Sequence, residues 1–342
     1  MTRPRSRPAR SRPALADLAP ERSLRRLELK VSRRLDGLLQ GEHMGLLPGP
    51  GTELAEARVY QPGADDVRHM DWAVTARTTT PHVRDLIADH ELEAWALVDL
   101  SASMDFGTAD FEKRDLVVAA LAAVGFLTVR LGDRVGAYIL HQGSIRRWPA
   151  RAGKAAMYAM LQSVLDAERT PAGEEGGPGL AAAISDLARG QTRRGLRVVI
   201  SDFLDPAPGP DDPEPDSAHL GTPPSAAAGR PAWERPLRRL AARHQVLAVE
   251  IIDPRELDLP DVGIVHMSDP ESGAVHEIVL SARVRRDYAQ AAAAQRARTR
   301  EALRRSGAHH LVLRTDRDWI TDVARFAMRQ RRVTGRAAGA RT

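Results

Sequence analysis

The sequence has no cysteine among its 342 residues, so disulfide bonds and thiolate metal ligands are excluded. Aromatic residues are also scarce, at 4% of the chain. The apolar side chains are mainly Ala, Leu and Val, which predicts an aliphatic core. A cysteine-free chain that is long enough to bury such a core fits a reducing compartment, and we expect a cytoplasmic protein.

Long hydrophobic runs are missing as well. The longest candidate, Leu116–Val129, has fourteen residues, whereas a helix that crosses a bilayer needs about 18 to 20. We therefore expect a buried core helix there and no transmembrane segment. The basic N-terminus has no apolar segment behind it, a pattern that does not fit a secretory signal.

Acidic residues are absent from both ends of the chain. Residues 1–13 contain five Arg, and residues 329–342 contain another five. Without these ten charges the net charge of +5 becomes −5, so the body of the chain is mildly acidic. Such tails can bind nucleic acid through phosphate contacts. Solvated termini are the commoner outcome, so a nucleic-acid partner is not favoured.

Composition and periodicity divide the chain into four parts. Residues 1–19 and 329–342 are expected to be Arg-rich tails without regular structure. Residues 20–92 hold a predicted helix, Leu18–Leu39, and a small β-rich element. Residues 93–328 alternate apolar strands with helices, which predicts an α/β fold: a doubly wound, mostly parallel sheet with helices on both faces.

Within residues 93–328 we predict ten main elements and one insertion. A hairpin over 262–280 and a last helix capped by Asp318 follow the same reasoning. Residues 205–231 hold eight of the 23 prolines and show no periodicity, which predicts a disordered insertion. The predicted strands are Ala94–Asp99, Arg134–His141, Leu196–Asp202, Gln245–Ile252 and His310–Arg314, and the predicted helices are Phe111–Leu131, Lys154–Ala167, Leu180–Arg189, Trp233–Arg243 and Ala282–Arg305.

Asp99, Ser101 and Ser103 form an Asp-x-Ser-x-Ser pattern at the end of the apolar run Trp95–Leu100. In extended backbone, residues two apart point to one side, so a carboxylate and two hydroxyls converge. Such oxygens suit Mg²⁺ or Mn²⁺, and Mg²⁺ leaves coordination positions open for a partner's carboxylate. Asp202 ends another predicted strand, and ligands bind beyond the carboxyl ends of parallel strands. These four residues therefore make a candidate metal site.

Two other interpretations of these residues stay open. Asp99, Ser101 and Asp202 can simply cap helices and turns, which is the commonest role of such residues. Alternatively, Asp99 is the nucleophile of a metal-dependent hydrolase or phosphatase. Enzymes of that kind usually carry a second acid two residues later, where this chain has Ser101. The sequence also lacks a nucleophile elbow, a zinc-binding His-Glu-x-x-His and a phosphate-binding loop, so we expect no enzymatic activity.

Asp99-x-Ser101-x-Ser103, followed about a hundred residues later by Asp202, resembles the metal-ion-dependent adhesion site (MIDAS) of von Willebrand factor A domains. More narrowly, the chain resembles the bacterial domain of unknown function 58 family over about residues 25 to 330. The segments that carry this likeness are Arg58-Val-Tyr-Gln-Pro-Gly-Ala-Asp-Asp-Val-Arg-His-Met-Asp-Trp72, Ala76-Arg77, Val98-Asp-Leu-Ser-Ala-Ser-Met104, Gly132-Asp-Arg-Val-Gly136, Ile200-Ser-Asp-Phe203, Ala241-Ala-Arg-His-Gln-Val-Leu-Ala-Val249 and Asp253-Pro-Arg-Glu256.

The resemblance implies a von Willebrand A-like sheet whose metal site binds partners rather than catalysing a reaction. Members are associated with MoxR-type AAA+ ATPases and are thought to act as adaptors or assembly factors. We therefore expect a MoxR-type AAA+ ATPase and its client protein as partners. Many relatives carry membrane helices near the N-terminus, and this chain resembles the soluble subgroup.

The chain departs from the family pattern at one position of the metal site. The fold usually adds a Thr at the head of a helix, where this chain has Gly177-Pro-Gly-Leu180. Thr170 is the one Thr between Thr128 and Thr192. Either a shifted loop brings Thr170 into the site or the site has one side chain fewer, which would weaken metal binding.

A second group of residues mixes opposite charges with two aromatic rings in the small β-rich element. We predict a salt-bridged turn that pins this element to the main sheet; the alternative is a docking surface for the partner. The residues are Tyr60, Asp65, Asp66, Arg68, Asp71, Trp72 and Arg77.

Overall fold

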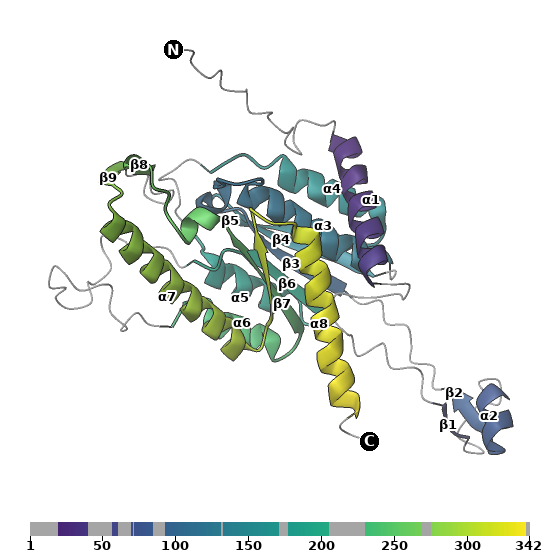
Figure 1. Ribbon diagram of the computed structural model, residues 1–342. Coiled ribbons are helices and arrows are strands. Elements are labelled where there is room, and N and C mark those ends of the chain that lie inside the picture. The colour runs from purple at the N-terminus through teal and green to yellow at the C-terminus, as the bar shows by residue number, and fades with distance from the viewer. Residues whose placement is uncertain are drawn as a thin grey trace, which may run out of the picture.

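The computed structural model describes residues 20–39, 57–60, 70, 72–84, 93–130, 133–170, 177–204, 230–268 and 275–339. A six-stranded sheet in the order β10-β7-β6-β3-β4-β5 lies at its centre, with helices on both faces (Figure 1). Five strands are parallel, and β5 runs antiparallel to β4 at one edge. The strands are β3 (Glu93–Asp99), β4 (Arg134–His141), β5 (Ser144–Arg151), β6 (Leu196–Ser201), β7 (Gln245–Ile252) and β10 (His309–Arg314).

The strand order reverses in the middle of the sheet. From β3 the chain continues to β4 on one side, whereas from β6 it continues to β7 on the other side. Adjacent loops leave such a switch point in opposite directions, and ligands of open parallel sheets bind there, beyond the carboxyl ends of the strands. The switch point of this sheet lies between β3 and β6, the two strands that precede Ser101 and Asp202.

The helices form two layers, one on each face of the sheet. One core cluster joins the sheet to α1 (Pro20–Leu39), α3 (Lys113–Arg130), α4 (Lys154–Leu165) and α8 (Trp319–Gly339). The other joins it to α5 (Leu180–Gly190), α6 (Glu234–Ala241) and α7 (Ala282–Ser306). Side chains of successive strand residues point to opposite faces, so the inner strands β3, β4, β6 and β7 contribute to both clusters. The predicted doubly wound, mostly parallel sheet is therefore confirmed.

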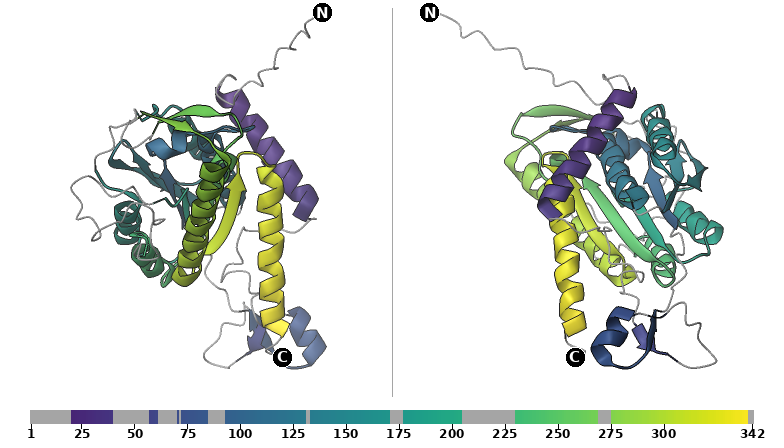
Figure 2. Two further views of the ribbon diagram at one scale, coloured as in Figure 1. Left: turned by 60° about the vertical axis from the view of Figure 1, so that its left-hand side comes forward. Right: turned by 90° about the vertical axis from the view of Figure 1, so that its right-hand side faces the viewer.

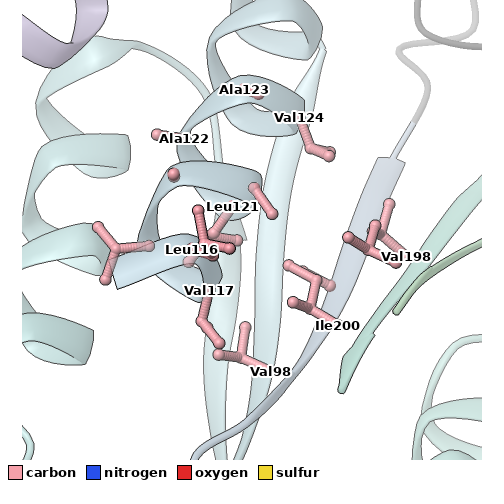
Figure 3. Close-up of a cluster of buried hydrophobic side chains, with 14 of the residues drawn as sticks. Val98, Leu116, Val117, Leu121, Ala122, Ala123, Val124, Val198 and Ile200 are labelled. Atoms are coloured by element: carbon pink, nitrogen blue, oxygen red, sulfur yellow. The ribbon is translucent and has the colours of Figure 1, made fainter. Parts of the chain in front are cut away.

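Helix α3 is the central helix of its layer. It is apolar on all sides, as expected of a helix enclosed by the sheet and other helices. Its residues Leu116, Val117 and Leu121 are fully buried, and Figure 3 shows them facing Val98 of β3 and Ile200 of β6. The prediction of a buried core helix here is confirmed. Within the described ranges we find no helix with the length and apolarity that a bilayer span requires.

Helix α1 confirms the predicted N-terminal helix and belongs to the main body. Its Leu24, Leu27 and Val31 are buried at helical spacing in the cluster that contains α3. Tyr158 of α4 donates a hydrogen bond to Glu28, and Arg34 forms an ion pair with Asp318 at 2.6 Å. Figure 2 shows α1 lying beside the start of α8.

The small element near residue 70 is only partly β. Its short strands β1 (Ala57–Val59) and β2 (His82–Arg84) pair antiparallel, but a helix, α2 (Trp72–Thr78), lies between them. The predicted β-rich element therefore also contains a helix, which was not predicted from the sequence. Threonine side chains stabilise the end of this helix. Thr78 Oγ1 donates to the Val74 carbonyl, and Thr75 Oγ1 accepts from the His82 N–H, which connects α2 to β2.

Two further elements differ from the prediction. Strand β5 was not predicted because its Arg-rich sequence with Pro149 lacks an apolar alternation; such residues are typical of an exposed edge strand. Helix α8 continues to Gly339, although residues 329–342 were expected to have no regular structure. The Ala and Arg residues of this segment have high helix propensity, which lets the helix extend. The predicted hairpin is present as β8 (Ile264–Ser268) and β9 (Val275–Val279). Two short 3₁₀ turns, η3 (Ala102–Asp105) and η4 (Pro254–Glu256), follow strands β3 and β7.

Gly136 of β4 is required by a close aromatic neighbour. A Cβ at this position would lie 2.6 to 2.8 Å from three ring atoms of Trp95, and Trp95 is fully buried. We expect Gly136→Ala to lower the free energy of unfolding by about 2 kcal/mol because the rigid ring cannot move away. Urea denaturation measures this. The control is Gly179→Ala, which adds the same methyl group where no atom of the described residues lies within 4 Å. Equal stability of the two variants would contradict the prediction.

His244 predicts a pH dependence of stability at the opposite end of the sheet from the candidate site. The residue is buried, and its Nδ1 has no hydrogen-bond partner among the described residues. Burial and the neighbouring Arg197 lower its pKa to about 4. The unfolded chain therefore binds a proton near pH 6.5 that the folded chain takes up only near pH 4, and stability falls as the pH is lowered across this window.

The corresponding measurement compares urea unfolding of the wild type and His244→Asn. Between pH 7 and pH 5 we expect the wild type to lose about 1 to 2 kcal/mol more than the variant, which has no titrating group at this position. The same pH dependence in both proteins would contradict the role of His244.

Candidate functional site

Asp99 is the last residue of β3, and the protein holds both of its carboxylate oxygens. Oδ1 accepts a hydrogen bond from the Ser101 N–H at 3.0 Å, and Oδ2 accepts from Ser201 Oγ at 2.6 Å. The residue is 4% exposed. Burial, and then the charge of Asp202, raise the pKa of Asp99 to about 6. The site therefore contains negative charge that the described residues do not fully compensate.

Ser101 and Ser103 lie in the loop that leaves β3. Their hydroxyl oxygens are 3.3 Å apart, and Ser103 Oγ donates a hydrogen bond to Asp202 Oδ2 at 2.8 Å. Ser101 and Ser103 are partly exposed, whereas Asp99 and Asp202 are buried beneath. The structure thus brings the four predicted residues together at the switch point of the sheet. We call Asp99, Ser101, Ser103 and Asp202 the oxygen cluster.

Asp202 is held by the sharp turn after β6. Its Oδ1 accepts from the Leu204 N–H at 3.1 Å. The next residue, Phe203, has a φ of +56°, which is unusual for a bulky side chain. Its N–H donates to Ser201 Oγ at 3.0 Å, and its carbonyl accepts from Trp233 Nε1 at 3.2 Å. These contacts hold a strained turn that aims Asp202 at the serines, and strain of this kind is typical of functional sites.

Lys113, the first residue of α3, was not predicted as part of the site. Its side chain is fully buried, and its Nζ lies 2.8 Å from Asp202 Oδ2 and 2.5 Å from Glu256 Oε1. Burial alone would lower the pKa of Lys113, but Asp202 and Glu256 outweigh it and raise the pKa. Burial likewise opposes ionisation of Asp202, yet the Lys113 ammonium lowers its pKa below the ordinary value. Lys113 and Asp202 are therefore both charged.

The backbone of Asp253 holds Glu256 in place, and Asp253 is itself held by several hydrogen bonds. The Asp253 N–H donates to Glu256 Oε2 at 2.9 Å. Asp253 is fully buried, and its carboxylate accepts from the backbone and hydroxyl of Thr108, the hydroxyl of Thr315 and the N–H of Arg255. These donors lower its pKa against the opposing effect of burial. These contacts connect the loops that follow β3, β7 and β10. We call this edge of the sheet, at the carboxyl ends of the parallel strands, the rim.

Thr170 lies next to the oxygen cluster rather than within its hydrogen bonds. Its N–H donates to Asp105 Oδ2 at 3.0 Å, and its hydroxyl donates to the carbonyl of Leu100 at 3.5 Å. Leu100 connects Asp99 to Ser101, so the loop after α4 brings Thr170 close to the cluster. One of the two predictions for Thr170, that a shifted loop carries it into the site, requires such a position. Among the contacts of the described residues, its hydroxyl bonds to none of the four members of the cluster. Its role as a metal ligand stays a prediction.

The donor chemistry of the oxygen cluster fits Mg²⁺ or Mn²⁺. Within the described residues, no group of three or more Asp, Glu, His or Cys side chains gathers around one point. A cation at the cluster would therefore depend on the serine hydroxyls together with the two carboxylates, a set that a hard cation accepts when waters complete its shell. Burial, and then the charge of Asp202, raise the pKa of Asp99, and a cation bound between the two carboxylates would offset both effects.

The predicted docking residues of the small element are only partly described. Trp72 is 70% exposed, and Arg77 is in the last turn of α2. The Tyr60 N–H donates to the Pro81 carbonyl at 2.8 Å. The remaining members, Asp65, Asp66, Arg68 and Asp71, lie outside the described residues. An exposed Trp72 suits a docking surface, and both interpretations of this group remain predictions.

Sequence reasoning missed Ser201, Lys113, Glu256 and Asp253 as members of the site. Ser201 precedes Asp202 directly, and Lys113 is one of only three lysines among the chain's 50 basic residues. These two signals were present in the sequence. The contacts of Lys113 with Asp202 and Glu256 join residues that are 89 and 143 positions apart, and no local pattern predicts such pairs.

Comparisons with known proteins agree with the predicted family. The family model described as "Protein of unknown function DUF58" matches residues 56–298. The uncharacterized protein Rv1480 of Mycobacterium tuberculosis is 51% identical over 310 residues, which cover 91% of this chain and 89% of that protein. The uncharacterized protein MAV169 of Mycobacterium avium is 42% identical over 186 residues, which cover 54% of this chain and 95% of that protein.

Solved structures similar to this chain include von Willebrand A-like domains. The conserved hypothetical protein BatB from Bacteroides thetaiotaomicron is 14% identical, with a TM-score of 0.35, over 70% of this chain and 99% of that one. The SpRpn10 VWA domain is 12% identical, with a TM-score of 0.32, over 68% of this chain and 94% of that one. The family model and the Mycobacterium tuberculosis relative confirm the predicted family, and the sheet itself confirms the predicted α/β, mostly parallel fold class.

Proposed function

This chain belongs to the DUF58 family of proteins of unknown function, and from the oxygen cluster at its rim we propose that it is a non-catalytic, metal-dependent protein-binding module. Mg²⁺ or Mn²⁺ is held by Asp99, Ser101, Ser103 and Asp202. An acidic side chain of the partner completes the coordination of the cation.

The observation that carries this proposal is the convergence of two loops on one point. Ser103 from the loop after β3 donates to Asp202 from the loop after β6, at 2.8 Å. The partly exposed serines lie above the buried carboxylates, an order that leaves the outer side of a bound cation toward solvent. A cation held from one side by oxygen ligands keeps waters on its other side, and a carboxylate can replace them.

The partner proposed here is a MoxR-type AAA+ ATPase or its client protein, with the chain acting as an adaptor or assembly factor in the cytoplasm. This part of the proposal is supported by the sequence resemblance. The exposed Trp72 of the small element offers a second contact for the same partner, because exposed aromatic side chains are typical anchors of protein interfaces.

The alternative, a hydrolase or phosphatase with Asp99 as nucleophile, has less support. Asp99 is 4% exposed, and both of its oxygens accept hydrogen bonds from the protein. A nucleophile must reach the reacting atom, and these contacts hold the carboxylate away from the surface. A screen of phosphatase substrates with Mg²⁺ or Mn²⁺ tests this alternative. Turnover that Asp99→Asn abolishes would favour the enzyme.

The test of the proposed function is capture of partners from a lysate of the source cells on the immobilised full chain. We expect an AAA+ ATPase to be retained in millimolar Mg²⁺ and released by a chelator. Bound proteins are identified by mass spectrometry, and the fraction retained is compared between the two conditions. Identical capture with and without chelator would contradict metal dependence, and capture without any ATPase would contradict the ATPase as the direct partner.

A further inference from the structure

We infer that Lys113 is a built-in cation of the oxygen cluster: it stabilises Asp202 when no metal is bound and lowers the affinity of the site for a divalent cation. This inference rests on the proposed function only in taking the oxygen cluster as the metal site. It concerns the chain's own charge balance and does not require a particular partner.

The first argument is the position of the ammonium. Asp202 Oδ2 accepts hydrogen bonds from Ser103 Oγ and from Lys113 Nζ, each at 2.8 Å. One oxygen atom therefore joins the ammonium to the hydroxyl group of the predicted metal site. A divalent cation bound to the cluster would share this carboxylate with an existing positive charge. Like charges so close together in a buried site repel strongly, because water does not screen them.

The second argument is that Lys113 cannot withdraw. Its side chain is fully buried. Its backbone N–H donates to the Phe106 carbonyl at 2.9 Å, which fixes the start of α3. The ammonium also contacts Glu256 at 2.5 Å, and Glu256 is held in turn by the backbone of Asp253. Burial and the two carboxylate contacts therefore hold the ammonium beside the cluster.

The third argument is the choice of residue. This chain uses Arg for nearly all of its positive charges and Lys at only three positions. A lysine ammonium is a compact point charge, whereas a guanidinium is a broad planar fork. Here the compact ammonium donates to both Asp202 and Glu256 while Ser103 keeps its own hydrogen bond to Asp202 Oδ2. The lysine at this position therefore has a specific role in the charge balance of the cluster.

The consequence is a cluster that is folded without metal and binds metal with moderate affinity. Without Lys113, the buried Asp202 and the partly exposed Glu256 would be two neighbouring carboxylates with no cation between them, and an unpaired buried charge such as that of Asp202 is destabilising unless a metal is present. With Lys113, the charge of Asp202 is largely balanced before any metal arrives. A partner's carboxylate then contributes a larger share of the binding free energy of the cation.

The experiment titrates Mn²⁺ alone into the metal-free full chain by isothermal titration calorimetry. The test variant is Lys113→Met with Glu256→Gln, which removes one positive and one negative charge and so keeps the net charge constant. We expect it to bind Mn²⁺ at least about tenfold more tightly than the wild type, which corresponds to about 1.4 kcal/mol. The control is Lys154→Met, which removes a lysine that is 61% exposed and pairs with Glu28; its affinity should equal that of the wild type.

A second variant keeps the inference testable if the double substitution does not fold. Glu256→Gln removes one of the two carboxylates that contact Lys113 and leaves Asp202 as the other. The positive charge of Lys113 then acts more strongly on Asp202, so we expect weaker Mn²⁺ binding than in the wild type. Circular dichroism should show a folded chain. Unchanged or tighter binding by this variant would overturn the inference, as would equal affinity of the double variant and the wild type, or no Mn²⁺ binding by either. If the affinities follow the expected order while partner capture is insensitive to chelator, the proposed function fails and the inference stands.

Discussion

Asp99→Asn is expected to abolish Mg²⁺-dependent partner capture while leaving the domain folded. The substitution keeps the shape of the side chain. Its amide oxygen accepts from the Ser101 N–H, and its NH2 group donates to Ser201 Oγ, so the contact with that hydroxyl reverses direction. It removes one of the two carboxylate charges of the oxygen cluster. Affinity for the cation should fall by at least about tenfold, since charge-assisted contacts are the strong ones in such a site.

The stability of the same variant distinguishes loss of binding from loss of folding. Burial and Asp202 raise the pKa of Asp99 to about 6, so its charge at neutral pH is unfavourable in the metal-free protein. A folded-state pKa above the unfolded value means that this group costs stability as the pH rises through about 6. At neutral pH and without metal, the melting temperature of Asp99→Asn should therefore equal or exceed that of the wild type.

The measurements are partner retention with Mg²⁺ and with chelator, and thermal melts of both proteins with and without Mg²⁺. The matched control is Asp166→Asn, which removes a carboxylate from the exposed residue after α4. Undiminished capture by Asp99→Asn, or a metal-induced rise in its melting temperature equal to that of the wild type, would contradict the assignment of Asp99 as a ligand.

Asp253→Ala is expected to destabilise the fold by about 3 kcal/mol, because it leaves buried donors without an acceptor. Asp253 is fully buried and accepts from Thr108, Thr315 and Arg255. Truncation also disconnects the loop that carries Glu256 from its neighbours. Because Glu256 holds Lys113, affinity of the oxygen cluster for Mn²⁺ should change together with stability.

Urea denaturation gives the stability of this variant, and calorimetry gives its Mn²⁺ affinity. Asp261→Ala is the control, since Asp261 is 75% exposed and forms one ion pair with Arg285; an exposed pair contributes at most about 1 kcal/mol. A loss no larger than that of the control would show that the hydrogen bonds around Asp253 are not important for stability.

The elements that could be predicted from the sequence are those with a strong local signal. Strands β4 and β7 have the predicted bounds, and the helix Leu116–Val129 lies within α3, because apolar periodicity and length separate buried strands from buried helices. Strand β5 and helix α2 were not predicted. Their residues are mostly polar or exposed, and pairing with β4 or local threonine hydrogen bonds decide their conformation.

The candidate site likewise contains residues that the sequence predicted and residues that it did not. Asp99, Ser101 and Ser103 are within five residues of one another, and the rule that parallel strands share a carboxyl rim places Asp202 near them. The sequence by itself therefore determined the oxygen-rich rim and the α/β sheet that carries it. Local backbone geometry and hydrophobic periodicity suffice for both.

Only the tertiary structure decided the charge state of that rim. Lys113 begins a helix, Glu256 follows β7, and Asp253 is held by Thr315 from the loop after β10. These residues meet because the sheet order brings the ends of β3, β6, β7 and β10 to one edge. Burial at that edge then fixes which carboxylates are paired and which stay uncompensated, since the energy of a charge depends on its distance from all others and on its access to water.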